Sequence, residues 1–427
     1  MYYMWQTILK VWQHKDLRNK IAYVLGLLII FRLAAHIPIP GVDINNLRNF
    51  FSSNAYLGFL NVFSGGALEN FSLVMLGVGP YITASIIFQL LGMIVPKLEE
   101  MQKETDGHRK IQQWTRYLAV PMALIQGYAT LMILQRTGGL LLNDITIWQK
   151  AMIVCLITGG SIFAMWLGEL ITEKNIGNGI SIIIFAGIVA RLPQATQQLL
   201  VSYDSSQLPL VVFYLAVALV MIFGVVYITE GQRNIPIATA RQMRGQSLAG
   251  RETHLPMRVN QAGVIPIIFA VSLVLIPPII GQYMAGTGIG WLVTFGNGIV
   301  YAFNNKLIYG LLYFFFVFVF TYFYTAVVFK PEQIAENLQK RGSFIPGIRP
   351  GKATIEYLQY VSNRLLLAGA VFLGLVAVLP VIIQALISGS TNSFIVGGTS
   401  LLIVVSVAIE TVKQIEAQLQ VREYEAF

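Results

Sequence analysis

Cysteine is nearly absent from this chain, and charged side chains are scarce. Cys155 is the only cysteine among 427 residues, which excludes a disulfide within the chain and a cysteine-based metal site. The four histidines are scattered and share no ligand spacing, so we expect no metal site and no cofactor. Charged residues make up 11% of the chain, whereas about a quarter is typical of soluble domains. These absences argue against a soluble metalloenzyme.

Catalytic motifs are also missing. The sequence has no GxSxG or HExxH motif and no pair of carboxylates within an apolar segment. Residues 347–354, GIRPGKAT, resemble a phosphate-binding loop, but Ala353 replaces the required Ser or Thr and the spacing of the glycines is one residue too short. We therefore expect that the chain is not an enzyme.

Apolar residues dominate the composition. A hydrophobic content of 56% and a mean hydropathy of +0.66 predict an all-α polytopic membrane protein. Ten apolar windows are suitable for membrane-spanning helices. They cover residues 21–35, 71–95, 117–134, 148–172, 179–201, 209–229, 262–285, 307–329, 361–386 and 396–412. An even number of spans places both termini on the same side of the membrane.

The distribution of positive charge predicts which side that is. Most of the 29 Lys and Arg residues lie in the termini and in the loops that share their side, which the positive-inside rule assigns to the cytoplasm. The exceptions are Arg32, Arg48, Arg136, Lys150, Arg191 and Lys306. Two cytoplasmic loops, at about 230–258 and 330–353, are rich in arginine and could bind a large anionic or acidic partner. Contact with lipid head groups alone is the alternative.

Two of the spans are interrupted near their starts. Residues 59–95 are too long and too broken for one plain helix, with Gly77, Gly79 and Pro80 inside the apolar run. The same kind of interruption, GVIP, returns at residues 263–266. Interrupted helices at matching positions of two halves indicate a central pathway between inverted repeats. We expect a short half-helix before the second span that points into a pore or site.

The centres of the spans hold no ionisable residue, but they do hold pairs of branched apolar residues. Val78 and Ile82, and likewise Ile180 and Ile184, are four residues apart and so share one helix face. Such pairs could face lipid or a neighbouring helix, or they could form a hydrophobic constriction that excludes water and ions. The spacing alone leaves both open.

Seven segments, in order along the chain, closely resemble the SecY family, the channel subunits of the bacterial and organellar protein translocase. These are IPIPGVD (37–43), FSGGALENFS (63–72), GPYITASIIFQLL (79–91), MWLGELITEKNIGNGISIIIFAGI (165–188), LPMRVNQAGVIPIIFA (255–270), AENLQKRGSFIPGIRPGK (335–352) and GGTSLLIVVSVAIE (397–410).

The resemblance implies ten helices in two inverted five-helix halves, 1–205 and 206–427, that open around an hourglass pore. It implies a re-entrant plug half-helix at about 58–70, with plug residues Phe63, Ser64, Gly65, Gly66, Ala67 and Leu68. It also implies an apolar pore ring of Val78, Ile82, Ile180, Ile184, Ile268 and Ile403. A lateral gate between spans 2–3 and 7–8 would carry the polar residues Thr83, Gln126 and Asn260.

As a function, the resemblance implies a passive protein-conducting channel, driven by the motor ATPase SecA or by the ribosome. The channel would translocate unfolded secretory proteins and release transmembrane segments sideways into the lipid. Docking of SecA or the ribosome would use Arg241, Arg244, Arg251, Arg349 and Lys352. Other implied partners are signal sequences, nascent polypeptides, membrane lipids, small SecE-like and SecG-like membrane subunits, and accessory proteins of the SecDF and YidC type.

Two other functions and a second location remain open at this stage. A secondary transporter with inverted repeats would need a charge near the membrane midplane, and none is found. A membrane scaffold or insertase without a continuous pore would tolerate charges at Ile82 or Ile184. The expected location is the bacterial plasma membrane, with the thylakoid as the alternative.

Overall fold

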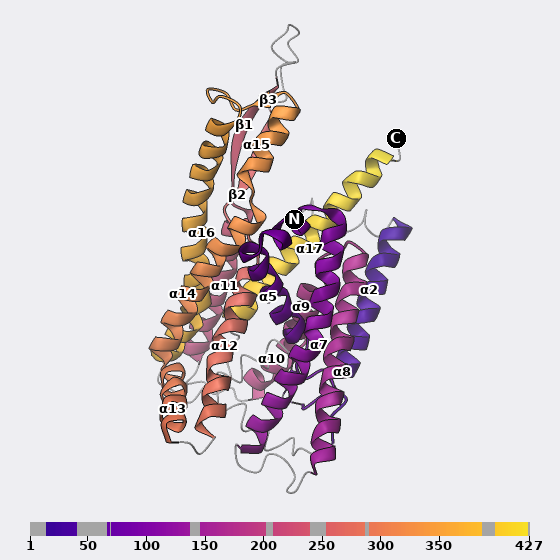
Figure 1. Ribbon diagram of the computed structural model, residues 1–427, viewed down its shortest axis with the longest axis vertical. Helices are drawn as coiled ribbons and strands as arrows, with labels where there is room; N and C mark the ends of the chain where they lie inside the picture. Colours follow the sequence, from indigo (N-terminus) through magenta and orange to yellow (C-terminus); the bar gives the residue numbers. More distant parts are fainter. Residues whose placement is uncertain are drawn as a thin grey trace.

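The protein is a bundle of long helices with a small β-sheet at one end (Figure 1). The computed structural model describes residues 14–40, 66–68, 70–136, 146–201, 208–239, 253–286, 290–386 and 398–425. The helices are α2 (Lys15–Ala34), α5 (Gly79–Ile94), α6 (Pro96–Lys103), α7 (Thr105–Arg136), α8 (Ile147–Glu173), α9 (Gly179–Val189), α10 (Leu192–Val201), α11 (Leu208–Glu230), α12 (Ile265–Ala285), α13 (Gly290–Asn304), α14 (Lys306–Val328), α15 (Pro331–Lys340), α16 (Lys352–Leu386) and α17 (Gly398–Glu425).

Each of the ten apolar windows overlaps at least one helix. Within the described ranges, five helices are both long and apolar enough to cross a membrane, and two shorter apolar helices accompany them. The window at 179–201 is divided between α9 and α10, which break at residues 190–191. Residues 290–304, which the windows left out, form the additional helix α13.

The second span begins later than the sequence predicted. Residues 71–78 form turns rather than helix, and α5 starts at Gly79 with Pro80 in its first turn. Proline is tolerated there because the first helical N–H groups have no partner within the helix. Phe71, with a φ of 44°, and Gly77, with a φ of 54°, have left-handed backbones that a right-handed helix cannot contain.

A three-stranded sheet joins the two loops that are rich in arginine. β1 (Gln232–Thr239) lies between β2 (Thr253–Arg258) and β3 (Ser343–Phe344), and both pairings are antiparallel. Ile235 pairs with Leu255 in register, and Ile235 is buried with Met257 in a small core against α16. The sequence analysis predicted no strands here.

The main hydrophobic core lies among the long helices, away from the sheet. Its buried side chains come from α2, α5, α8, α9, α11, α12, α14, α16 and α17. Aromatic contacts join α12 to α14, where the Phe269 ring meets Phe320 and Tyr324 edge to face at 6.2 and 6.0 Å between centroids. This core surrounds the positions that the sequence analysis assigned to a pore.

Candidate functional site

Five of the six predicted ring residues are buried in the main core. Their exposed fractions are 3% for Val78, 8% for Ile82, 1% for Ile184, 5% for Ile268 and 0% for Ile403. They come from the start of α5 and from α9, α12 and α17, and they belong to one hydrophobic cluster. The structure therefore buries these five residues in the same hydrophobic core.

The sixth residue, Ile180, is partly buried and packs against the same cluster. Its side chain lies close to α8: a Cβ added to Gly168 would be 2.6 Å from Ile180 Cδ1. Gly168 therefore leaves the space that Ile180 occupies.

A tight turn between α8 and α9 positions Ile180 and Ile184. Asn178 caps α9, and its Oδ1 accepts hydrogen bonds from the backbone N–H groups of Ile180 (3.1 Å) and Ser181 (3.4 Å). The N–H of Gly179 donates to Thr172 Oγ1 at 2.9 Å. A Cβ at Gly179 would be 1.8 Å from the Gly168 carbonyl oxygen, so glycine is required for the two helices to approach this closely.

Helices α5 and α12 begin in the same way. In residues 77–80 (GVGP) and 263–266 (GVIP), the glycine has a positive φ, 54° at Gly77 and 66° at Gly263. The following valine is the N-cap, and the proline lies in the first helical turn. Two ring residues, Ile82 and Ile268, each lie two residues beyond this proline. The local geometry of the two starts thus places equivalent side chains at the fourth position of each helix, about one turn from its start.

The predicted plug lies only partly within the described residues. Phe63, Ser64 and Gly65 fall outside them. Gly66, Ala67 and Leu68 form turns, so the prediction of a helix is wrong for this part of the segment. The physical reason is the backbone of Gly66, whose φ of 84° is left-handed. Ala67 and Leu68 are nonetheless buried, at 0% and 4% exposed.

Helix α8 holds the turns that follow the plug residues. Ser161 Oγ donates to the carbonyl oxygen of Gly77 at 2.8 Å. A Cβ at Gly160 would be 1.9 Å from the carbonyl oxygen of Leu73, so α8 and this irregular backbone are in close contact. Polar backbone groups in a membrane protein need such partners, because lipid supplies none.

Among the described residues, one hydrogen bond joins two of the three predicted gate residues, and the third bonds elsewhere. Gln126 Nε2 of α7 donates to Thr83 Oγ1 of α5 at 3.2 Å, which confirms that these two side chains meet. Asn260, just before α12, instead donates from Nδ2 to the carbonyl oxygen of Gly263 at 3.2 Å. Its Oδ1 is buried and accepts no hydrogen bond from the residues that the structure describes. The observed bond therefore joins spans 2 and 3, both on the same side of the predicted gate.

The comparisons with known proteins identify the family. The SecY family model matches residues 72–412. The protein translocase subunit SecY of Mycobacterium tuberculosis is 43% identical over 434 aligned residues, covering 96% of this chain and 97% of that protein. SecY of Streptomyces coelicolor is also 43% identical, with the same coverage. This chain belongs to the SecY family.

Solved SecY-like structures share the fold. A protein-conducting channel superposes with a TM-score of 0.64 at 19% identity, covering 93% of this chain and 91% of that one. A SecY whose plug domain is described as stabilising the closed channel gives 0.66 at 20% identity, covering 92% of this chain and 91% of that one. Sec61 in a canine ribosome–channel complex gives 0.60 at 18% identity, with coverages of 93% and 91%.

As a member of this family, the chain is a multi-pass membrane protein and a channel subunit of a protein translocase, not an enzyme. The resemblance seen in the sequence motifs is confirmed over nearly the whole length.

Of the residues expected to dock partners, the structure describes two. Arg349 and Lys352 are exposed, between β3 and the start of α16. The turn between them is held by Thr354 Oγ1, which donates to the carbonyl oxygen of Arg349 at 2.9 Å, and by the left-handed backbone of Gly351. Arg241, Arg244 and Arg251 lie outside the described residues.

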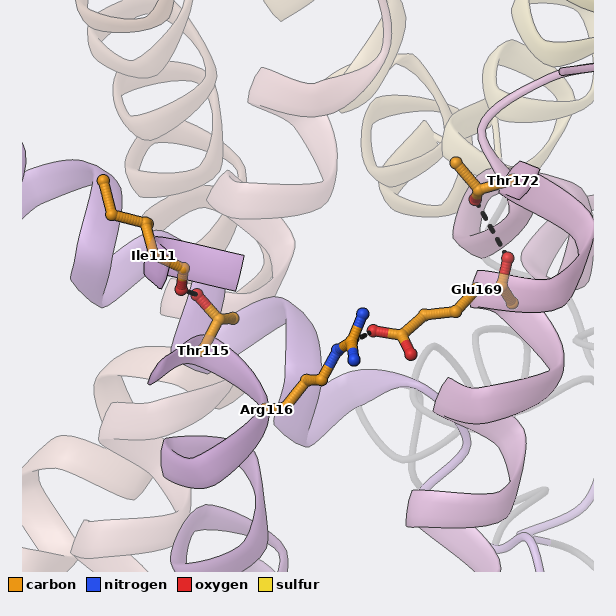
Figure 2. A network of polar contacts seen from close by, with 6 residues as sticks. Ile111, Thr115, Arg116, Glu169 and Thr172 are labelled. Carbon is orange, nitrogen blue, oxygen red and sulfur yellow. Dashed lines mark hydrogen bonds and ion pairs between the residues drawn. The ribbon is translucent and has the colours of Figure 1, made fainter. Parts of the chain in front are cut away.

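One polar contact was not predicted from the sequence. Figure 2 shows Arg116 of α7 reaching Glu169 of α8, where Nε and Oε1 form an ion pair. The side chains are 46% and 22% exposed, so the pair contributes no more than about 1 kcal/mol. The two residues are 53 positions apart, and no local pattern in the sequence connects them.

Proposed function

We propose that this chain conducts unfolded polypeptides through its centre and that Val78, Ile82, Ile184, Ile268 and Ile403, with Ile180 beside them, form the seal. The observation that supports this most is their burial in one apolar cluster, although they come from four separate parts of the chain. A narrow apolar ring excludes water and ions by dewetting and offers no polar group that would bind a passing chain. Such a ring suits a passive channel better than a solute carrier, which needs a polar site.

The repeated starts of α5 and α12 support the two inverted halves, 1–205 and 206–427. Matching interruptions in two halves are typical of transport proteins with a pathway at the repeat interface. In this chain both interruptions carry a ring residue at the same offset. The plug, at about 58–70, would fill the outer funnel beside this interface.

The lateral gate that we propose lies between α5–α7 and α12–α14, and it is only weakly closed. The bond between Thr83 and Gln126 does not cross it. The buried Oδ1 of Asn260 accepts no hydrogen bond from a described residue, so it adds no polar link across the gate. Burial of one large apolar side chain yields about 1.5–3 kcal/mol, so a signal sequence with several leucines could open the gate.

The cytoplasmic sheet would serve as a docking platform. It ties the loop at 230–258 to the loop at 330–353, and β2 ends two residues before Asn260. A partner that moves the sheet would therefore act directly on the start of α12. We propose SecA and the ribosome as these partners; the ribosome is supported by the Sec61 channel of the same fold in the canine ribosome complex. SecE-like and SecG-like subunits would complete the translocon, with SecDF and YidC-type proteins as further partners.

For the location, we propose the bacterial plasma membrane with both termini in the cytoplasm. The support is the distribution of Lys and Arg together with relatives in Mycobacterium and Streptomyces.

The pore is tested by a photo-crosslinker at Ile184 in proteoliposomes that contain the chain and its small partner subunits. A secretory precursor is stalled during export. Crosslinks from Ile184 to the mature part of the precursor are expected, with few from the exposed positions Met93 of α5 and Ile280 of α12. Efficient crosslinking only at Met93 and Ile280 would show that substrates insert sideways, as in the insertase alternative.

Docking is tested separately by Arg349→Glu, which should impair motor-driven export without affecting folding, because the side chain is exposed. Arg341→Glu is a matched control, since Arg341 is an exposed arginine at the end of the neighbouring α15. Normal export by the Arg349 variant, or equal losses in both variants, would contradict the assignment.

A further inference from the structure

The additional helix α13 has an unusual surface. Trp291, Phe295 and Tyr301 are 71%, 61% and 75% exposed, and they lie on one side of the helix with Thr294 and Asn297. Residues 290–304 contain no charged side chain. A face of this kind is unsuited to bulk water, where charged residues are expected on a solvent-exposed helix.

Helix α13 is also too short to cross a membrane. Its 15 residues correspond to about 22 Å, whereas the hydrocarbon core is about 30 Å thick. In Figure 1 it lies at the end of the bundle opposite the β-sheet, beside the outer end of α12. It therefore lies near the membrane surface that is remote from the sheet.

Close backbone contact fastens α13 to α12. A Cβ at Gly296 would be 2.6 Å from the carbonyl oxygen of Gly281 and 2.6 Å from the backbone nitrogen of Ala285. Small residues at helix contacts in membrane proteins permit this close packing. The outer end of α12 cannot shift without carrying α13 with it.

The exposed face of α13 continues a surface that is already apolar. Ile280 and Tyr283 of α12 are 49% and 56% exposed, and Leu307 and Leu311 of α14 are 73% and 71% exposed. In a multi-pass membrane protein, such side chains on the outside of a bundle face lipid. Trp and Tyr are enriched where the lipid meets water, because their rings are apolar and their N–H or O–H groups are polar.

From these observations we propose that α13 is an interfacial anchor: its aromatic face lies in the head-group region of the leaflet remote from the sheet and holds the outer end of α12 there. The occupant of this surface is lipid rather than a second copy of the chain or another membrane subunit. The absence of charge, the aromatic composition and the continuity with the exposed faces of α12 and α14 all favour lipid.

The test uses the full chain in liposomes of phosphatidylcholine and phosphatidylglycerol. Because Cys155 is the only cysteine, Cys155→Ser gives a background for a single spin label at Phe295→Cys. Collision of the label with oxygen, which concentrates in lipid, is compared with collision with a water-soluble nickel complex. Labels at Ile280→Cys and Arg341→Cys serve as references for the lipid interior and for water.

We expect the label at position 295 to be more accessible to oxygen than to nickel, with a ratio between those of the two references. A ratio equal to that at position 341 would overturn the proposal in favour of a water-exposed helix. Low accessibility to both reagents would overturn it in favour of a protein partner.

A second measurement leaves the aromatic face unlabelled. Lipids brominated near the head group should quench more tryptophan fluorescence in the native chain than in the Trp291→Phe variant. The difference in quenching between the two proteins should be smaller when the bromines lie deep in the acyl chains. No difference between the two proteins would contradict the anchor. Neither readout depends on transport, so a failure of the proposed pore would leave this result unaffected.

Discussion

Replacing Ile403 by asparagine is the most direct perturbation of the proposed seal. Ile403 is fully buried on α17, in the cluster shared by the other ring residues. The substitution forfeits about 1.5–3 kcal/mol of apolar burial. An amide without a partner in this buried site costs about 1–3 kcal/mol more. The closed state should therefore lose about 3–6 kcal/mol, which corresponds to roughly a 10²- to 10⁴-fold shift toward hydrated or open states.

The assay measures ion conductance across planar bilayers that contain the reconstituted translocon, together with export of a precursor whose signal sequence is defective. Both should increase in I403N. Leu402→Asn is the matched control, because Leu402 is also 0% exposed and belongs to the same cluster on the same helix, but it is not a ring residue. Its folding penalty should be similar, without the leak. Unchanged conductance in I403N, or an equal leak in L402N, would refute the seal.

Two further predictions concern the contacts around the ring and the gate. A double-mutant cycle with Thr83→Ala and Gln126→Ala, followed by thermal unfolding in detergent, should give a coupling of about 0.6–2 kcal/mol from their 3.2 Å hydrogen bond; additive effects would show that the bond contributes nothing. Gly168→Ala should displace the Ile180 side chain and raise the ion leak, because the new methyl group would be 2.6 Å from Ile180 Cδ1, the movable end of that side chain. Gly159→Ala, on the same helix with no atom within 4 Å of the added Cβ, should do neither; similar effects in both variants would argue against a specific contact.

Hydropathy was sufficient to locate the long helices. About 20 apolar residues in a row are needed to cross the lipid, and this requirement is visible in composition alone. Hydropathy could not show where a helix begins inside an apolar run. The start of α5 at Gly79 depends on the left-handed backbones of Phe71 and Gly77 and on the contacts with α8, not on hydropathy.

The strands of the three-stranded sheet were missed for a specific reason. Pro236 and Pro256 lie within β1 and β2, and proline normally argues against a strand because it lacks a backbone N–H donor. The pairing is stabilised instead by the buried Ile235 and Met257 against α16. That packing involves residues more than 100 positions apart and leaves no local pattern.

The candidate site was likewise predicted from the sequence only in part. The pairs Val78–Ile82 and Ile180–Ile184 were visible as shared helix faces, and the resemblance to SecY proposed a role for them. Whether such faces meet lipid or each other depends on how the helices pack. The structure buries Ile184 almost completely and leaves Ile180 against Gly168; no spacing rule distinguishes the two.

By itself, the sequence determined that this is a polytopic membrane protein of the SecY family, because hydropathy, charge bias and long motifs are properties of the linear chain. The tertiary structure alone decided which side chains meet. It paired Gln126 with Thr83, left Asn260 Oδ1 without a hydrogen bond from any described residue, and brought Gly281 against Gly296. These contacts depend on the crossing of whole helices, which is set by the summed packing of many residues rather than by any short segment.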